Sequence, residues 1–290
     1  MDYVFMTDSN SDLPYALQDK YNIPVVYMPY VLGGVEYFAD LGRGGDNKAF
    51  YDQMRAGATP VTSLLPTAAY LEYFEPVLKE KDLLFIAFSS QLSNTIQNIY
   101  AAREELLQKY PNRKFMVVDT MSISAPETLL ILGAHKLYRE GRPMEEVAQW
   151  VEDNKMRAQA WMTEDDLKYL KRGGRISSTA AFLGSMLDLK PILVEGRGGK
   201  ICPAEKVQGR KKALRVLAER TYENIERPEE QTIIIMHADA AEDAKRLEEL
   251  IRQKLPNVGG VLTIFVGPVI GTHCGPGTVA SCFMGKERAI

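Results

Sequence analysis

Five short segments of the sequence are rich in serine, threonine, glycine, histidine or arginine. They are residues 7–9, 62–63, 89–95, 171–177 and 271–277. Hydroxyl groups and free backbone N–H groups that point toward one place can hold an anion such as a carboxylate or a phosphate. The residue types in these segments therefore suit anion binding as well as helix capping and turns.

Residues 89–95 (SSQLSNT) follow an apolar run and precede a helical pattern. A turn between a strand and a helix directs hydroxyl groups and the free N–H groups of the first helical turn at one point. Ser93 has two interpretations, a cap of the following helix and a ligand of an anion. The two can coexist, because one hydroxyl can cap the helix in the free state and bind an anion when a ligand arrives.

His273 is one of three histidines and lies among glycines, which allow close approach of a backbone. It is either a structural histidine or part of the site, whereas His135 and His237 are expected to be structural. Lys171 and Arg172, followed by two glycines, are typical of the end of a helix. Arg175 lies beyond that end and is the better candidate for contact with an anion or a partner.

Several reaction classes lack their sequence signatures. The chain has no HExxH motif, no paired histidines and no clustered cysteines, so no metal site is expected. It has no GxxxxGKS/T loop for ATP and no GxGxxG after a strand, so no cofactor is expected. Ser93 and His273 could in principle act as nucleophile and base, but the GxSxG elbow of hydrolases is absent. No residue is therefore assigned as catalytic.

Hydrophobic residues make up 46% of the 290 residues and charged residues 25%, a balance typical of a protein with a buried core. The net charge is −3 and no basic block is present, which argues against nucleic acid as a partner. Three cysteines without CxxC spacing favour a reducing cytoplasm over a disulfide framework. The sequence has no signal-peptide pattern, and no apolar run reaches the roughly 18–20 residues that span a bilayer. We expect a cytoplasmic protein without stable membrane insertion.

The order of apolar runs and helical patterns predicts the fold class. Strands are expected at residues 3–6, 23–27, 83–88 and 115–118, with a hairpin at 31–38. Residues 124–127 (SAPE) match a capping box that opens a helix to about residue 139. This alternation is typical of a parallel α/β sheet, in which ligands bind at the carboxyl ends of the strands.

The pattern changes after a helix at about residues 143–155. Strands are expected at 158–163, 192–194, 200–203, 232–236 and 261–266, and helices ending near 174 and spanning 211–225 and 241–255. The mixed order predicts an α+β arrangement with a mainly antiparallel sheet. We therefore predict an N-terminal α/β domain over residues 1–156 and a C-terminal α+β domain over residues 157–290.

Six motifs in this order resemble the DegV family over essentially the whole chain. They are TDS at 7–9 with DLP at 12–14, TS at 62–63 with PT at 66–67, SSxLSxT at 89–95, DT at 119–120 with Ser124, LxxLKRGGRIS at 167–177, and GxHxGPG at 271–277. The resemblance implies a two-domain DegV-like fold that holds one long-chain fatty acid in an internal tunnel. It also implies that the protein is not itself an enzyme.

In the bacterial fatty acid kinase system, such a protein presents the bound carboxylate to a separate ATP-dependent kinase subunit. The product is an acyl phosphate, which can feed phospholipid synthesis. The resemblance places Thr62, Ser93, His273 and the backbone around Asn94 at the fatty acid carboxylate. It makes Arg175, with Arg210 nearby in the next basic segment, a candidate for kinase docking or for facing phosphate.

The chain departs from the family pattern at several positions. Asn94 stands where the family usually has glycine, and asparagine tolerates positive φ better than most residues. Pro126 and Thr128 replace two glycines, which puts close approach of a ligand there in doubt. Gln208 replaces a common arginine, so contact with a kinase could be altered.

Two other functions remain open from the residues alone. One is a stand-alone phosphoryl- or acyl-transfer enzyme that uses His273 as acid or base. The other is a module on the same scaffold that binds small acids without a lipid tail. Binding that strengthens with acyl length would separate the lipid carrier from this second alternative.

Overall fold

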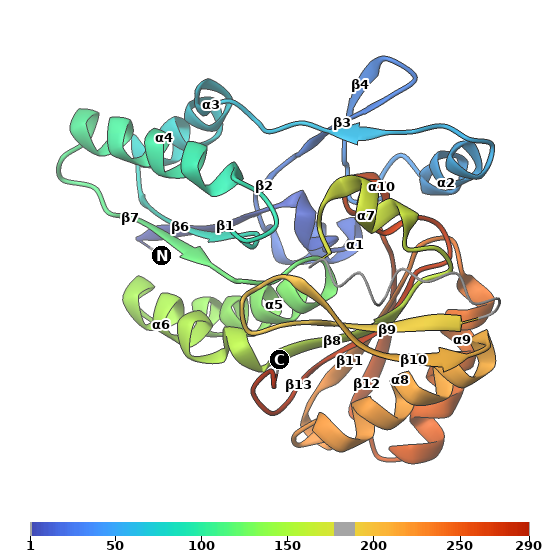
Figure 1. The fold of residues 1–290 in the computed structure, drawn as a ribbon. Helices are drawn as coiled ribbons and strands as arrows, with labels where there is room; N and C mark the ends of the chain where they lie inside the picture. The colour runs from blue at the N-terminus through green and yellow to red at the C-terminus, as the bar shows by residue number, and fades with distance from the viewer. Residues whose placement is uncertain (1, 177–188, 290) are drawn as a thin grey trace.

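The computed structural model describes residues 2–176 and 189–289, which form two large sheets and one small sheet (Figure 1). Ser177, the last residue of the basic motif, lies outside the described residues.

The first sheet consists of four parallel strands in the order β2-β1-β6-β7. The strands are β1 (Tyr3–Asp8), β2 (Val25–Val26), β6 (Asp82–Ala87) and β7 (Phe115–Asp119). Helices α3 (Thr67–Leu78) and α4 (Thr95–Lys109) cover one face, and α5 (Ala125–Arg139) and α6 (Met144–Asn154) cover the other (Figure 1). Successive residues of β6 point to opposite faces, so Phe85 packs on the side of α3 and Leu84 on the side of α5. Strand β6 is apolar because both of its faces are covered.

The second sheet has six strands in the order β10-β9-β8-β13-β11-β12. They are β8 (Ala158–Thr163), β9 (Leu189–Glu195), β10 (Ile201–Gln208), β11 (Thr232–His237), β12 (Gly260–Phe265) and β13 (Val279–Met284). Strands β11 and β12 are parallel and the other neighbours are antiparallel. Helices α8 (Arg210–Asn224) and α9 (Ala241–Lys254) cover one face of this sheet. The parallel first sheet and the mainly antiparallel second sheet confirm the predicted fold class.

The third sheet is small and carries residues of the site. It has the order β4-β3-β5, with β3 (Pro29–Leu32), β4 (Val35–Phe38) and β5 (Val61–Thr62). Helices α2 (Asn47–Arg55), α7 (Lys168–Gly173) and α10 (Pro268–Cys274) lie in this region, where α10 contacts β3, β5, α2 and α7. Helix α1 (Tyr15–Tyr21) packs instead on the α5 side of the first sheet. The 3-10 turns are η1 (Ser9–Ser11), η2 (Lys155–Arg157) and η4 (Pro228–Glu230). No described helix combines the length and the apolar character that crossing a membrane requires.

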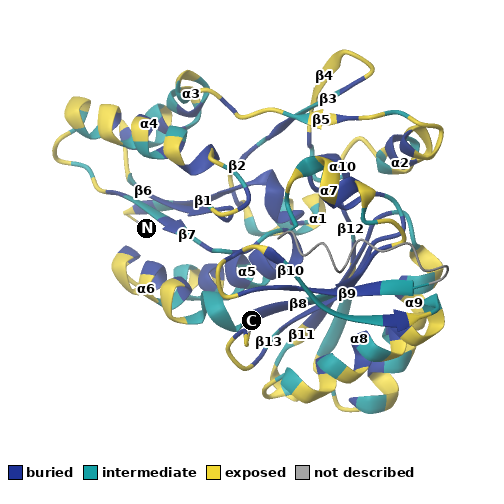
Figure 2. Cartoon of the chain, in the orientation of Figure 1, coloured by how far each residue is buried: buried dark blue, intermediate teal, exposed yellow. Residues whose placement is uncertain are grey.

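Helix α5 connects the two halves of the chain. It contacts β1 of the first sheet and β8, β11 and β13 of the second, and Figure 2 shows it as a mostly buried helix. The largest hydrophobic cluster likewise contains side chains from both halves, such as Phe85 and Met236. The chain passes from one half to the other at η2, but the division at residues 156 and 157 stays a prediction.

The predicted capping box at the start of α5 is wrong. Ser124 has a φ of 54°, whereas a capping residue is usually extended, and its side chain does not cap the helix. The Ser124 hydroxyl instead donates a hydrogen bond of 2.5 Å to Asp12 Oδ2, and Asp12 Oδ1 accepts one from the Gly267 N–H. Glu127 is fully buried and does not reach back to the helix start. Asp12 therefore joins α5 to the segment before α10, a tertiary requirement that overrides the local motif.

The sequence patterns did not predict helices α1, α2, α3 and α10 or strands β5 and β13. Helix α10 is instructive, because its glycine disfavours a helix in isolation. A Cβ at Gly271 would lie 2.3 Å from Tyr51 Oη, and this hydroxyl donates to the Val266 carbonyl. Tight packing against Tyr51 therefore explains why a glycine stands inside this helix.

Candidate ligand-binding site

A cavity of about 230 Å³ lies where the first, second and third sheets meet. Its volume is many times the roughly 10–15 Å³ that a single water needs by the same measure. Most of its wall is apolar and comes from both halves of the chain, from Met28, Leu64, Phe88, Leu92, Ile123, Met162, Leu170, Ile201, Met236, Val269, Ile270 and Cys274. Polar side chains also line it, namely Asn10, Thr62, Ser63, Ser93, Asn94, Thr95, Ser124, Glu164, Arg175 and His273. A mainly apolar cavity with a few polar groups is the usual form of a small-molecule site.

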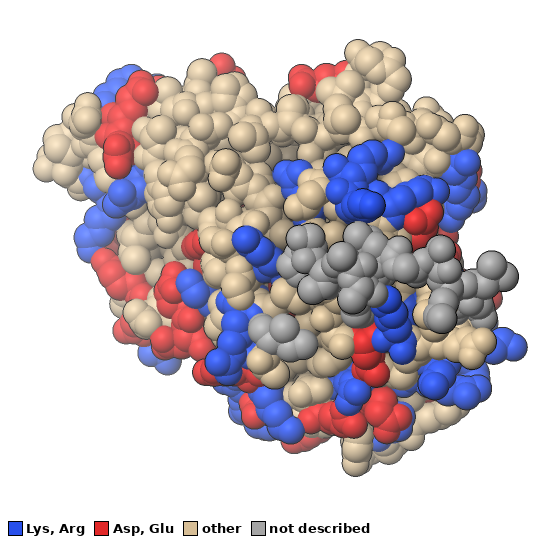
Figure 3. Space-filling model, viewed as in Figure 1, with Lys and Arg blue, Asp and Glu red and all other residues tan. Residues whose placement is uncertain are grey.

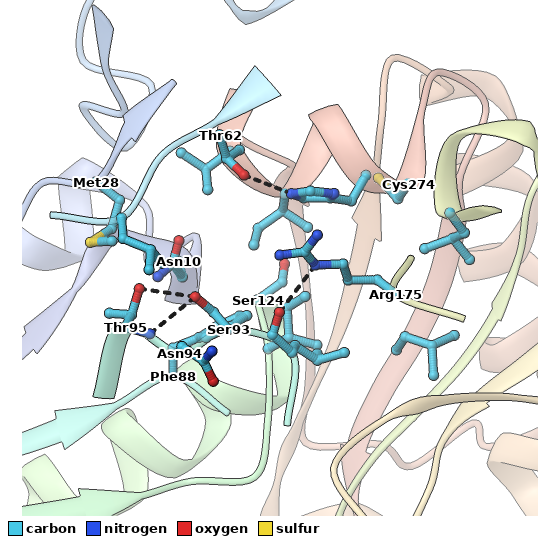
Figure 4. Close-up of a pocket in the computed structure, with 18 of the residues that line it drawn as sticks. Asn10, Met28, Thr62, Phe88, Ser93, Asn94, Thr95, Ser124, Arg175 and Cys274 are labelled. Atoms are coloured by element: carbon cyan, nitrogen blue, oxygen red, sulfur yellow. Dashed lines mark hydrogen bonds between the residues drawn. The ribbon is translucent and has the colours of Figure 1, made fainter. Parts of the chain in front are cut away.

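Four of the side chains expected at the site lie on this cavity. Thr62 on β5, Ser93 and Asn94 before α4, and His273 on α10 all belong to its lining. Figure 4 shows the Thr62, Ser93 and Arg175 side chains converging from three different segments. The structure thus brings together residues separated by up to 211 positions in the sequence.

Thr62 and His273 form a hydrogen-bonded pair. The distance from Thr62 Oγ1 to His273 Nε2 is 2.9 Å. Burial, together with the positive charges of Arg175 and Arg172, lowers the pKa of His273 to about 4. The imidazole is therefore neutral at neutral pH, with one nitrogen able to donate and the other able to accept. Its Nδ1 is buried and has no hydrogen-bond partner among the described groups.

Ser93 bonds to the first residue of α4. Its hydroxyl oxygen accepts a hydrogen bond from the Thr95 N–H at 3.2 Å, and its proton is donated to Thr95 Oγ1 at 2.9 Å. Asn94 has a φ of −77°. The turn therefore needs no positive φ at this position, and asparagine fits it without strain.

Arg175 links the basic segment to the turn before α4. Its Nε donates to the Leu92 carbonyl at 3.1 Å, and its Nη1 donates to the Gly173 carbonyl. Arg175 lines both the cavity and a second pocket, which also shares Thr62 and His273 with the cavity. Arg175 therefore supplies positive charge close to the Thr62–His273 pair.

Arg210 lines neither the cavity nor the pocket that contains Arg175. Its Nε donates to Asp243 Oδ2 at 2.8 Å and its Nη2 to the Gly277 carbonyl at 2.5 Å. Its Nη1 is 3.6 Å from Asp165 Oδ1, and Arg210 does not line the cavity. In the described structure the Arg210 side chain holds the start of α8 in place, and Gln208 at the end of β10 is exposed.

The other motif residues build the walls of the site. Asp8 Oδ1 accepts from the Asn10 N–H, and Asp119 Oδ1 accepts from the N–H groups of Ser90 and Met121. The Thr128 hydroxyl donates to the Ser11 carbonyl at 2.7 Å. Ser124 lines the cavity, whereas Pro126 and Thr128 do not. The two positions at which the family usually has glycine are therefore not part of the cavity wall in this chain.

Five polar residues of the lining were not among the expected site residues, namely Asn10, Ser63, Thr95, Ser124 and Glu164. Ser63, Thr95 and Ser124 belong to the motifs that carry the family resemblance and could have been found there. Glu164 directly follows β8, but the pattern of a strand end does not reveal that its side chain turns into the interior.

The absence of a side chain at Gly173 leaves room for the imidazole ring of His273. A Cβ at Gly173 would lie 2.5 Å from His273 Nδ1. Gly173 is helical, so alanine there should cost little backbone strain and should even favour the helix by up to about 1 kcal/mol. We expect Gly173→Ala to displace the ring, break its bond to Thr62 and shift the His273 signals in NMR spectra.

Gly198→Ala is the control for this variant, because its Cβ would meet no heavy atom within 4 Å. Identical His273 signals in the wild type and in Gly173→Ala would show that the ring tolerates a Cβ at residue 173, and that the glycine is not needed to position it.

The fold and the site define an α/β protein with a mainly apolar ligand cavity between its sheets. The family model described as an uncharacterised protein of the DegV family matches residues 4–286. A DegV domain-containing protein of Clostridium perfringens, CPE0026, is 40% identical over 287 residues, which cover 99% of this chain and 98% of that protein. The chain belongs to the DegV family.

Solved structures resemble this chain over nearly its whole length. A fatty-acid-binding DegV family protein from Thermus thermophilus has a TM-score of 0.85 and 28% identity, with 99% of this chain and 100% of that chain covered. DegV from Bacillus subtilis, a fatty acid binding protein, has a TM-score of 0.83 and 28% identity with the same coverage.

Proposed function

We propose that this protein binds one long-chain fatty acid in the cavity and presents its carboxylate to a separate ATP-dependent kinase. The observation that carries the proposal is the lining of the cavity, an apolar wall that ends in a group of neutral hydroxyls beside Arg175. Fatty acid binding by the similar solved proteins from Thermus thermophilus and Bacillus subtilis supports it.

The apolar wall supplies most of the affinity. A C16 tail has about fifteen methylene-type groups worth roughly 0.8 kcal/mol each when buried, a gross gain near 12 kcal/mol before the costs of association. Three of the lining side chains, Met28, Met162 and Met236, are unbranched and adaptable. They can repack along a long chain.

Hydroxyl groups are suited to fix the acidic end. When Nε2 of the neutral His273 carries the proton, it donates to Thr62 Oγ1 and leaves the Thr62 proton free for a carboxylate oxygen. The Ser93 hydroxyl can rotate from Thr95 to the second oxygen. Hydrogen bonds to a charged acceptor are stronger than neutral ones, so neutral donors suffice.

The neutral imidazole does not favour an enzyme that uses His273 as acid or base. A pKa of about 4 lies well below the range in which a general acid or base works best at neutral pH. Its bond to Thr62 gives it a positioning role instead.

The surroundings of the carboxylate site support presentation to a second protein. The second pocket, which shares Thr62, Arg175 and His273 with the cavity, is also lined by Arg172. Lys171 and Arg172 on α7 are exposed, and Figure 3 shows basic side chains on the face that carries this helix. These cations could meet a phosphate group or an acidic partner surface.

Ser93→Ala separates a helix cap from a ligand residue. We expect the dissociation constant for palmitate to rise about tenfold or more, since a hydrogen bond to a charged group is worth about 1.5–3 kcal/mol. The loss of its bond to the Thr95 N–H should also lower the free energy of unfolding by about 1 kcal/mol. Titration calorimetry and chemical denaturation measure the two effects.

Ser90→Ala is the matched control, because Ser90 lies on the same turn and does not line the cavity. Reduced stability with an unchanged dissociation constant in Ser93→Ala would leave Ser93 as a cap only.

The presentation step needs its own test. With ATP and palmitate, acyl phosphate should form only when this protein and a purified fatty acid kinase subunit are both present. Turnover by this chain alone would contradict the proposal and favour an independent enzyme.

A further inference from the structure

One carboxyl group of the cavity has no partner in the described structure. Glu164 is fully buried and lines the cavity together with Met162, Leu170 and Cys274. Neither Glu164 Oε1 nor Oε2 makes a hydrogen bond to any described group. A buried polar group without a partner costs about 1–3 kcal/mol, so this arrangement requires an explanation.

An ion pair does not explain the buried carboxyl group of Glu164. Arg210, the cation that acts on Glu164 electrostatically, pairs instead with Asp243, Asp165 and the Gly277 carbonyl. Glu164 therefore does not hold α8 to the sheet through a salt bridge within 4 Å.

The environment of Glu164 favours the protonated form of its carboxyl group. Burial, and to a smaller extent the charge of Asp166, hold the pKa of Glu164 well above its usual value, and Arg210 opposes the shift only in part. A protonated carboxyl group has one O–H donor and one carbonyl acceptor. In an apolar site such a neutral acid can donate a hydrogen bond to a ligand.

We propose that Glu164 is a specificity-determining residue of the cavity and selects acyl chains that carry a hydroxyl or keto oxygen along the chain. The inference rests on the proposed function and names the class of ligand. Glu164 is the one acidic side chain among the cavity-lining residues of the described structure, on a wall that is mainly apolar. A plain hydrocarbon tail would leave the acid unpaired, whereas an oxygen at the matching position would pair with it. Sites built to hydrogen-bond a ligand group reject analogues that lack it.

The experiment compares stearate with a positional series of monohydroxystearates by titration calorimetry. In the wild type, one position or two adjacent ones should bind at least about tenfold more tightly than the other isomers, as one satisfied hydrogen bond allows. In Glu164→Leu this peak should disappear, and stearate should bind at least as tightly as to the wild type. Glu164→Gln should keep the peak, because the amide retains a donor and an acceptor of similar size.

Glu127→Leu is the matched control, because Glu127 is also fully buried without a hydrogen-bond partner in the described structure but does not line the cavity, and the peak should stay in place. A wild type with no preferred position, or a peak that survives Glu164→Leu, would overturn the inference. If stearate itself shows no saturable binding, the proposed function fails as well. If stearate binds and no isomer depends on Glu164, only the inference fails.

Discussion

Affinity for straight-chain fatty acids should rise about fourfold with each added methylene until the cavity is filled. Each buried methylene contributes roughly 0.8 kcal/mol, and 1.4 kcal/mol corresponds to a factor of ten. From C10 to C16 the six added groups amount to about 5 kcal/mol, or roughly three orders of magnitude in the dissociation constant. The apolar wall of the cavity, which includes Phe88, Met236 and Ile270, is the physical reason.

Competition against a fluorescent fatty acid measures this series under one condition. Alcohols of the same lengths are the control, because they share the tail and lack the carboxylate that Thr62 and Ser93 are expected to hold. Dissociation constants that stay flat from C6 to C16 would contradict tail burial. They would support a module that binds small acids on the same scaffold.

Filling the cavity should abolish binding while the fold remains. Ile270 on α10 is only 5% exposed and lines the cavity. The larger ring system of Ile270→Trp should occupy space that a hydrocarbon chain needs. We expect palmitate binding to fall by at least about a hundredfold, since several methylenes would lose their place at about 0.8 kcal/mol each.

Ile270→Leu is the control, because it nearly conserves the volume and should bind palmitate within a few-fold of the wild type. Overpacking costs about 1–3 kcal/mol, so thermal unfolding must show that Ile270→Trp is still folded. A folded Ile270→Trp protein with wild-type affinity would show that the fatty acid does not lie in this cavity.

The sequence predicted best where local chemistry and fold agree. An apolar strand that ends in hydroxyl residues before a helix predicted the β6–α4 segment, and Ser93 lies there on the cavity. Residue spacing alone did not bring Thr62 and His273 together. The family resemblance placed both residues at the fatty acid carboxylate, and in the structure Thr62 Oγ1 lies 2.9 Å from His273 Nε2.

Features set by tertiary contacts could not be predicted locally. Residues 124–127 match the sequence of a capping box, but the Ser124 hydroxyl donates its hydrogen bond to the buried Asp12 instead of accepting one from the helix. Arg210 is one basic residue among several in sequence, and only its contacts with Asp243 and Gly277 show how it is used. Glu164 follows a strand like many surface acids, and its burial depends on the packing of both sheets.

Native mass spectrometry of freshly purified protein tests the central claim most directly. We expect a protein peak that is heavier than the polypeptide by the mass of one long-chain fatty acid, and organic extraction should release that acid. A protein that has only its polypeptide mass, and that takes up no added palmitate, would contradict the account.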